Sequence, residues 1–325
     1  MLLALSEDPR VQLVAVATVP TSARSLPAGY VDLAPFAAAR GLPVIDGRSL
    51  GFAETLADLS ALDLDLMVVC GWTRLVPAAA LGIPRRGCVG FHASMLPSHR
   101  GRAPVNWAII HGARETGATM LMLDAGVDTG AILDQRPVSI GPLDTCATVY
   151  SKVAEAGVAM LRAQLPALLA GTLRGVAQAA DDGDVLPRRT PEMGITDWSL
   201  TPKQVHDWIR ALTHPYPGAF SFVEGRCLRL WRAEPATDVV SGAGKGAVPG
   251  EIVGCDGAGV LVRARGGVVR LLVVQDGDVE MPARQWIRTS GVRPGARFDP
   301  VEPAVSRWAR GIGAPPYQSQ NALVS

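Results

Sequence analysis

The 325-residue chain has few cysteines and no close pair of them. The five cysteines are spread along the sequence, and none forms a Cys-x-x-Cys motif. Neither a disulfide framework nor a zinc site is therefore expected, and no metal ion is predicted as cofactor. Scattered free thiols are typical of proteins in a reducing compartment, so we expect a cytoplasmic protein.

An excess of charge of one sign is also lacking. Lys and Arg together number 31, and Asp and Glu number 30, which gives a formal net charge of +1. A protein whose main ligand is a polyanion usually carries a basic excess or a clustered basic face. The balance therefore weighs against tRNA as substrate, although a local basic patch would escape such a count.

The sequence also lacks targeting and membrane-spanning signals. The N-terminus has no basic region before its short apolar run and turns acidic at Glu7 and Asp8, so no signal peptide is expected. No window approaches the roughly 18 uninterrupted apolar residues of a membrane span. With 48% hydrophobic and 19% charged residues, the composition is typical of a soluble globular protein with no membrane partner.

The first part of the chain alternates apolar runs with helical patterns. This rhythm predicts an α/β fold, a parallel sheet with crossover helices. Strands are expected at residues 11–18, 64–70, 88–91 and 119–123. Helices are expected at residues 34–40, 53–62 and 146–169.

After about residue 185 the pattern changes. A polar, turn-rich connector leads to an amphipathic helix over residues 203–212, and short β-rich runs separated by glycine-containing turns follow, as in a small barrel. These runs are residues 219–223, 227–232, 250–253, 260–264 and 268–274. Residues 241–246 have the composition of a flexible loop, and the chain after about residue 310 that of an unstructured tail.

Two segments between Gly87 and Gly130 carry the functional signal. Residues 90–101 are Gly-Phe-His-Ala-Ser-Met-Leu-Pro-Ser-His-Arg-Gly, and residues 124–130 are Asp-Ala-Gly-Val-Asp-Thr-Gly. They resemble the catalytic core of the 10-formyltetrahydrofolate-dependent formyltransferases, a superfamily that includes methionyl-tRNA and amino-sugar formyltransferases. Its signature is Asn-x-His-x-Ser-Leu-Leu-Pro-x-x-Arg-Gly, followed downstream by Asp-x-Gly-x-Asp-Thr-Gly.

The resemblance extends over nearly the whole chain and implies its domains. It implies a Rossmann-like formyltransferase catalytic domain over residues 1–185 and an interdomain segment with one helix over 186–218. An OB-like domain over 219–310 and a tail over 311–325 follow. Members usually open with a strand, whereas Met1–Leu5 resemble the end of a helix, so we expect the first strand to be missing through a truncated or misassigned N-terminus.

The resemblance implies that His92 and Asp128 are catalytic. An imidazole titrates near neutrality and can move a proton, while a carboxylate can orient it. Each residue alone has an ordinary interpretation, because a single His beside an apolar strand is usually structural and Asp-Thr-Gly is a common turn. The joint pattern favours a formyltransferase site.

The same resemblance assigns residues that bind the donor and the acceptor. The folate donor, 10-formyltetrahydrofolate, is expected to contact Gly71, Trp72, Thr73, Arg74, Leu75, Leu123, Asp124 and Thr129. The acceptor is expected to contact Ser94, Arg100 and Arg102; alternatively, Arg100 pairs with a core carboxylate.

Gly90 stands where the family signature has asparagine. In the family that amide donates a hydrogen bond to the formyl oxygen, and loss of such a donor costs about 2.7–4 kcal/mol in comparable sites. Three interpretations of Gly90 are open. A water molecule or a backbone N–H replaces the asparagine amide, or another side chain such as Ser94 or His99 replaces it. Alternatively, the protein binds folate with little turnover. If the missing donor limits the rate, Gly90→Asn raises transfer. We favour a working enzyme.

The acceptor is expected to be a small-molecule amine. Residues 19–42 contain two basic residues, Arg24 and Arg40, where tRNA-binding members are strongly basic. Residues 188–192 and 213–220 resemble the amino-sugar formyltransferases. An amino sugar or an N-hydroxylated amino acid is therefore preferred over methionyl-tRNA. The oligomeric state is left open, with a homodimer as one option.

Two further classes remain as alternatives. One is a folate-binding protein with little turnover, which Gly90 keeps open. The other is a nucleic-acid module, because OB-like barrels bind single strands. Arginines that could form a basic face there are Arg226, Arg229, Arg232, Arg263, Arg265 and Arg270. Few aromatic residues lie between them to stack on bases, which favours an ordinary solvated surface.

Overall fold

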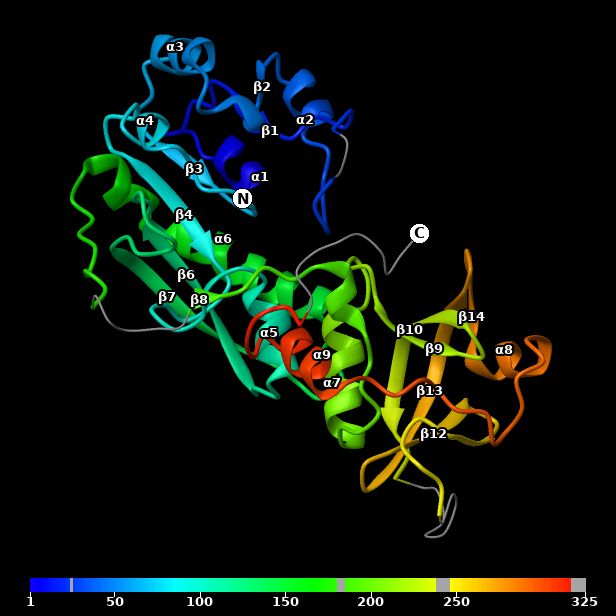
Figure 1. Ribbon diagram of the computed structural model, residues 1–325. Coiled ribbons are helices and arrows are strands. Elements are labelled where there is room, and N and C mark those ends of the chain that lie inside the picture. The colour runs from blue at the N-terminus through cyan, green and yellow to red at the C-terminus, as the bar shows by residue number, and fades with distance from the viewer. Residues whose placement is uncertain (24–25, 180–184, 238–245, 317–325) are drawn as a thin grey trace. The chain divides into compact units, whose positions relative to one another are not determined.

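The computed structural model describes residues 1–23, 26–179, 185–237 and 246–316 (Figure 1). These residues form two compact units. The first consists of Met1–Pro104, Glu115–Ser139 and Val149–Leu186. The second consists of Val105–Arg114, Ile140–Thr148 and the chain from Pro187 onward. Two short segments from the first half of the sequence therefore belong to the second unit.

The first unit is an α/β structure. Its strands are β1 (Val16–Thr18), β2 (Val44–Asp46), β3 (Met67–Val69), β4 (Cys88–His92), β5 (Arg100–Gly101), β6 (Glu115–Met122), β7 (Ile132–Ser139) and β8 (Val185–Leu186). Its helices are α1 (Leu2–Ser6), α2 (Ala34–Ala38), the 3₁₀ turn η1 (Gly47–Ser49), α3 (Ala53–Ala61), α4 (Ala78–Leu81) and most of α6 (Cys146–Ala170). The main sheet has the order β3-β4-β6-β7, and β1-β2 and β5-β8 form separate pairs.

The predicted α/β class is confirmed, but the main sheet is not wholly parallel. β3 and β4 run parallel, with α4 in the connection between them. β6 runs antiparallel to both β4 and β7. The loop 123–131 between β6 and β7 is too short for the crossover that a parallel pair needs. At the N-terminus, α1 agrees with the helical pattern of Met1–Leu5, and within the described residues β3 is an edge strand.

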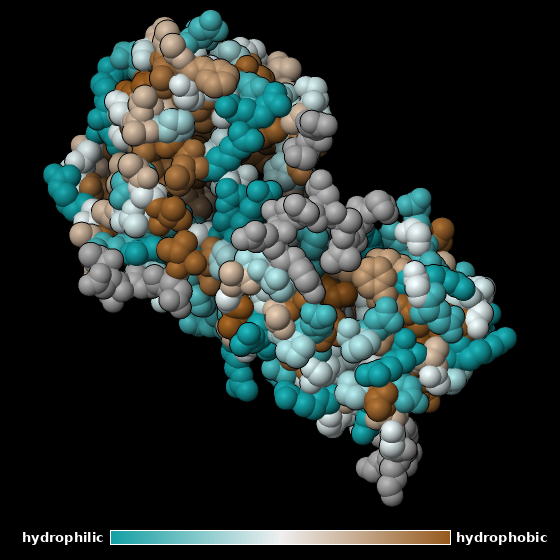
Figure 2. Space-filling model, in the orientation of Figure 1, coloured by the Kyte–Doolittle hydropathy of each residue, from teal (hydrophilic) through white to brown (hydrophobic). Residues whose placement is uncertain are grey.

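α6 supplies the core behind this sheet. Its buried residues Met160 and Leu168 pack with Val89 of β4 and Met120 of β6. Among the described residues, α6 is the single helix long and apolar enough for a membrane span, which is weak evidence because the core helix of a soluble protein passes the same test. Its contacts with the sheet are those of a core helix. On the face shown in Figure 2, hydrophobic residues lie in separate groups between hydrophilic ones.

The second unit is built on an antiparallel sheet of order β11-β12-β13-β10-β9, with β14 paired to β13. Its strands are β9 (Ala219–Val223), β10 (Arg226–Pro235), β11 (Ile252–Cys255), β12 (Val260–Ala264), β13 (Gly267–Asp276) and β14 (Val279–Pro282). Its helices are α5 (Pro104–Ile110), η2 (Pro191–Gly194), α7 (Pro202–Leu212), α8 (Ala283–Thr289) and α9 (Pro303–Ala309). The expected small β domain is confirmed.

Local signals explain where α7 begins. The side chain of Thr201 accepts a hydrogen bond from the backbone of Gln204, whose side chain binds back to Thr201. This capping box satisfies N–H groups that the first turn of a helix leaves free. The predicted bounds of β9 and β12 agree with the structure. Of the predicted loop 241–246 and tail 311–325, residues 241–245 and 317–325 lie outside the described residues.

Candidate functional site

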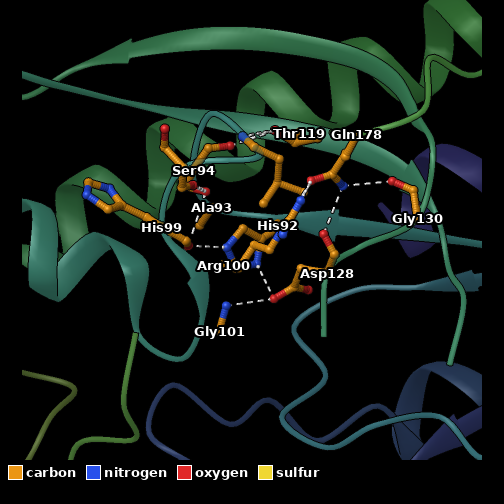
Figure 3. A network of polar contacts seen from close by, with 12 residues as sticks. His92, Ala93, Ser94, His99, Arg100, Gly101, Thr119, Asp128, Gly130 and Gln178 are labelled. Atoms are coloured by element: carbon orange, nitrogen blue, oxygen red, sulfur yellow. Dashed lines mark hydrogen bonds and ion pairs between the residues drawn. The ribbon is translucent and has the colours of Figure 1, made fainter. Parts of the chain in front are cut away.

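His92 and Asp128 lie together in the first unit (Figure 3). His92 ends β4, and its Nδ1 is 3.5 Å from Oδ2 of Asp128. On the other side of the ring, Nε2 lies 2.8 Å from the carbonyl oxygen of His99. A carbonyl can only accept, so Nε2 carries a proton, and Nδ1 faces a carboxylate. Nδ1 and Oδ2 therefore face each other within ion-pair distance, an arrangement through which a proton can pass.

The turn after β4 fixes the position of His92. The hydroxyl of Ser94 donates to the carbonyls of Ser98 and His99, at 2.7 and 3.3 Å. The hydroxyl of Thr119 donates to the carbonyl of Ser94, at 2.6 Å. Ser94 is 1% exposed, and its hydroxyl is engaged within the turn. This placement favours a structural role for Ser94 over contact with an acceptor.

The loop between β6 and β7 presents Asp128. Asp124 holds this loop, because its Oδ1 accepts hydrogen bonds from the Gly126 N–H at 3.0 Å and the Thr129 hydroxyl at 2.7 Å. A side chain at Gly130 would overlap the carbonyl oxygen of Met122, so the loop requires glycine there. The side chains of Asp124 and Thr129 thus stabilise the loop, as the turn interpretation of this sequence predicts.

A pocket opens beside Asp128. It is lined by Val69, Trp72, Arg74, Leu75, Val76, Gly90, Phe91, Leu121, Leu123, Asp124, Gly126 and Asp128. Of the residues expected to contact the donor, Trp72, Arg74, Leu75, Leu123 and Asp124 are in this lining, and Gly71, Thr73 and Thr129 are not. Val69, Phe91 and Leu121 lie on strands, and Val76 lies in the loop after β3. Apolar residues of this kind carry no individual sequence signal of facing a pocket.

One buried thiol lies close to the pocket in the sequence. Burial raises the pKa of the Cys88 thiol, two residues from Gly90, to about 11, so this thiol stays neutral at physiological pH. Within the described part of the chain, no group of three or more His, Cys, Asp and Glu side chains is placed to hold a metal ion.

Leu123 occupies the space where a side chain at position 90 would begin. A Cβ built on Gly90 would overlap Cδ2 of Leu123 and lie 3.0 Å from its Cγ. Asn106 is not a substitute donor in this pocket, because its amide nitrogen donates to the carbonyl of Ala211 at 2.6 Å. Glycine at position 90 and leucine at position 123 therefore form one packed unit.

Comparison with known proteins settles the family. The family model described as formyl transferase matches residues 10–165. The model of the formyl transferase C-terminal domain matches residues 188–291. The chain belongs to the formyl transferase family. It is an enzyme of the N-formyltransferase type, and its one-carbon donor is formyltetrahydrofolate.

Relatives of this formyltransferase include two methionyl-tRNA formyltransferases. Methionyl-tRNA formyltransferase of Geobacter sulfurreducens is 34% identical over 260 residues, 79% of each chain. That of Burkholderia multivorans is 35% identical over 274 residues, 81% of this chain and 82% of the other.

Solved structures share the fold. A sugar N-formyltransferase from a Shewanella species has a TM-score of 0.52 at 21% identity, over 61% of this chain and 79% of that one. HypX of Aquifex aeolicus in complex with tetrahydrofolic acid has a TM-score of 0.60 at 22% identity. That match covers 82% of this chain and 45% of HypX.

The pocket of this formyltransferase fits a folate. The buried indole Nε1 of Trp72 has no hydrogen-bond partner among the described residues. The backbone of residues 71–75 forms no hydrogen bond with another described residue. Free backbone groups beside apolar walls suit a flat heterocycle with polar edges. Trp72 and Leu75 would hold such a ring, and the donor supplies a formyl group for transfer.

Gly90→Asn provides a test of the packing with Leu123. The new side chain displaces Leu123 into the pocket, and overpacking typically costs about 1–3 kcal/mol. We expect weaker binding of 5-formyltetrahydrofolate, by about tenfold, and recovery in the double variant Gly90→Asn/Leu123→Ala. Calorimetric titration measures both. Gly254→Asn is the matched control, because nothing lies within 4 Å of a Cβ at that position. Undiminished binding by Gly90→Asn would contradict this account.

Arg100 and Arg102 occupy different environments. Arg100 is 6% exposed and donates to Oε1 of Gln178 from Nε at 3.1 Å and from its terminal nitrogen Nη2 at 2.8 Å. The hydrogen bonds to Gln178 account for the position of Arg100, and neither a carboxylate nor an acceptor is needed to explain it. Arg102 is exposed and remains available for an acceptor. Sequence reasoning did not identify Gln178, which belongs to no motif.

Proposed function

We propose that this formyltransferase transfers the formyl group of 10-formyltetrahydrofolate to the amine of a small molecule, such as an amino sugar or an N-hydroxylated amino acid. We place the catalytic domain at residues 1–185, the interdomain segment at 186–218 and the OB-like domain at 219–310. Free thiols and a folate donor are consistent with work in the cytoplasm.

The charge of the unit that carries the site is the observation that supports a small acceptor. By sequence, this unit has 13 Lys and Arg residues against 16 Asp and Glu residues, a net charge of −3. Five of its twelve arginines form ion pairs with its own carboxylates. These ion pairs are Arg10–Asp8, Arg48–Asp46, Arg85 with Asp63 and Asp65, Arg136–Asp134 and Arg162–Glu7. A net negative charge, with five arginines already paired, does not favour binding of a polyanion.

Asp128 is placed to take the proton that an attacking amine loses. Its Oδ2 accepts from the Gly101 N–H at 2.9 Å and faces His92. Its Oδ1 has no hydrogen bond to the described residues, and Asp128 lines the pocket. His92 stabilises the charged carboxylate through Nδ1 and shares its proton. A positioned acid–base pair of this kind contributes about 10²–10⁴-fold in rate.

Methionyl-tRNA is the second candidate acceptor. The relatives reported above bear that name, and the second unit has 18 Lys and Arg residues against 14 Asp and Glu residues, a net charge of +4. A polyanion could bind that unit by charge. Residues 19–42 argue against it, because this segment contains two basic residues, Arg24 and Arg40. Arg40 stacks 3.8 Å over the ring of Phe36.

An acceptor comparison tests the proposal. Formation of tetrahydrofolate from 10-formyltetrahydrofolate is followed with nucleotide-linked amino sugars, with N-hydroxylated amino acids and with initiator methionyl-tRNA. We expect turnover with a small amine, little with the tRNA, and a rate about 10²–10⁴-fold lower with Asp128→Asn. Faster transfer to the tRNA, falling steeply as salt increases, would establish the second candidate instead.

A further inference from the structure

Gln178 connects Arg100 to the loop that presents Asp128. It lies after α6, just past Val176, which bridges to Ile132 of β7. Its Oε1 accepts both hydrogen bonds from Arg100. Its Nε2 donates to the carbonyls of Asp128 at 2.8 Å and Gly130 at 2.7 Å (Figure 3). The carboxamide thus uses both donors and both acceptor positions.

The direction of the Gln178 amide is determined by its neighbours. A guanidinium can only donate, so Arg100 selects the oxygen end of the amide. The carbonyls of Asp128 and Gly130 can only accept, so they select the nitrogen end. Each half of the network therefore enforces the other, and a carboxylate at position 178 would satisfy Arg100 while facing the two carbonyls with negative charge.

Asp128 is held at two points. Its φ of +53° lies in the left-handed region, which non-glycine residues adopt rarely and which the surroundings must enforce. Gln178 holds the backbone carbonyl of Asp128, and the N–H of Gly101 holds its Oδ2. With both contacts, the carboxylate is fixed beside His92. Without Gln178, the backbone of the loop loses its tether.

We propose that Gln178 is a positioning residue, which holds Asp128 in the orientation needed for proton transfer without itself contacting either substrate. Arg100 acts through it by aligning its amide. The catalytic consequence rests on the proposed function of the site, whereas the structural tether does not.

Hydrogen exchange of the Gly101 amide tests the tether in the protein without substrates. This N–H reports the position of the Asp128 carboxylate, which accepts its hydrogen bond. In Gln178→Ala we expect this amide to exchange about tenfold faster, towards the rate in Asp128→Ala. The control is Gln164→Ala, which removes a carboxamide bound to Asp134 in the same unit. Wild-type exchange in Gln178→Ala would overturn the proposal.

Kinetics with the acceptor that the acceptor comparison identifies test the catalytic role of Gln178. We expect Gln178→Ala to lower kcat by about 10²-fold, with the KM for the donor changed less than threefold, since small misplacements of catalytic groups have effects of this size. Gln178→Glu retains an oxygen for Arg100 but loses the donors to the loop, so it should be as impaired as the alanine variant. Wild-type kcat in either variant would overturn the role of Gln178. Absence of transfer by the wild type would instead refute the proposed function, and the exchange result would still decide the tether.

Discussion

Replacement of His92 by alanine is expected to lower the rate of formyl transfer by about 10²–10⁴-fold. His92 Nδ1 faces Asp128, and its Nε2 binds the carbonyl of His99. Without the imidazole, Asp128 loses the side chain that faces its Oδ2, and the Gly101 N–H remains as its hydrogen-bond donor. Single-turnover formation of tetrahydrofolate measures this loss directly.

Two further variants make this result interpretable. His92 is 9% exposed, so alanine also removes buried contacts and should lower the melting temperature. His92→Gln retains more volume and a side-chain N–H donor, and we expect the same loss of rate with less loss of stability. His111→Ala is the control, because that ring is exposed and stacks on Trp107 in the second unit. Near wild-type rates in both His92 variants would remove His92 from the mechanism.

Asp128→Asn is expected to lower kcat by about 10²–10⁴-fold while donor binding changes little. Asparagine has almost the same shape, its carbonyl can accept from the Gly101 N–H, and it tolerates the left-handed backbone of this position. It cannot take up the proton of an attacking amine. The kcat of the variant and its affinity for 5-formyltetrahydrofolate separate chemistry from binding.

A second carboxylate of the same unit serves as control. Asp134 on β7 accepts hydrogen bonds from the N–H of Gln135 and from Gln164, so Asp134→Asn changes a partly buried carboxylate that does not line the pocket. We expect its kcat to stay within a few-fold of wild type. If Asp128→Asn retained more than about a tenth of the wild-type kcat, proton transfer through this carboxylate would be excluded as the main route.

Hydrophobic spacing was sufficient to predict much of the fold. The long helix α6 follows from apolar residues at helical spacing, and β9 and β12 follow from short β-rich runs between turns. The direction of β6 was not predictable in this way, because a buried apolar run is the same in a parallel and an antiparallel strand. The short loop 123–131 was the usable signal, since it cannot carry a crossover.

The site was predictable as far as its motif extends. His92 and Asp128 belong to the motif, and the structure brings them together. Contacts between positions without a motif were not predictable. Two such contacts are the packing of Leu123 against Gly90 and the hydrogen bond from Gln178 to the carbonyl of Asp128. Both arise from tertiary packing alone. Ser94 and Thr129 lie in the motif, yet their hydroxyls hold turns, which sequence alone does not distinguish from binding.

Calorimetric titration with 5-formyltetrahydrofolate tests most directly whether the pocket beside Gly90 and Asp128 is the donor site. The account predicts micromolar binding by the wild type and at least tenfold weaker binding by Leu75→Asp, which places a charge on the apolar wall. The matched control is Leu143→Asp, because Leu75 is 60% exposed and Leu143 is 86% exposed outside the pocket. No binding by the wild type, or equal binding by all three proteins, would contradict the account.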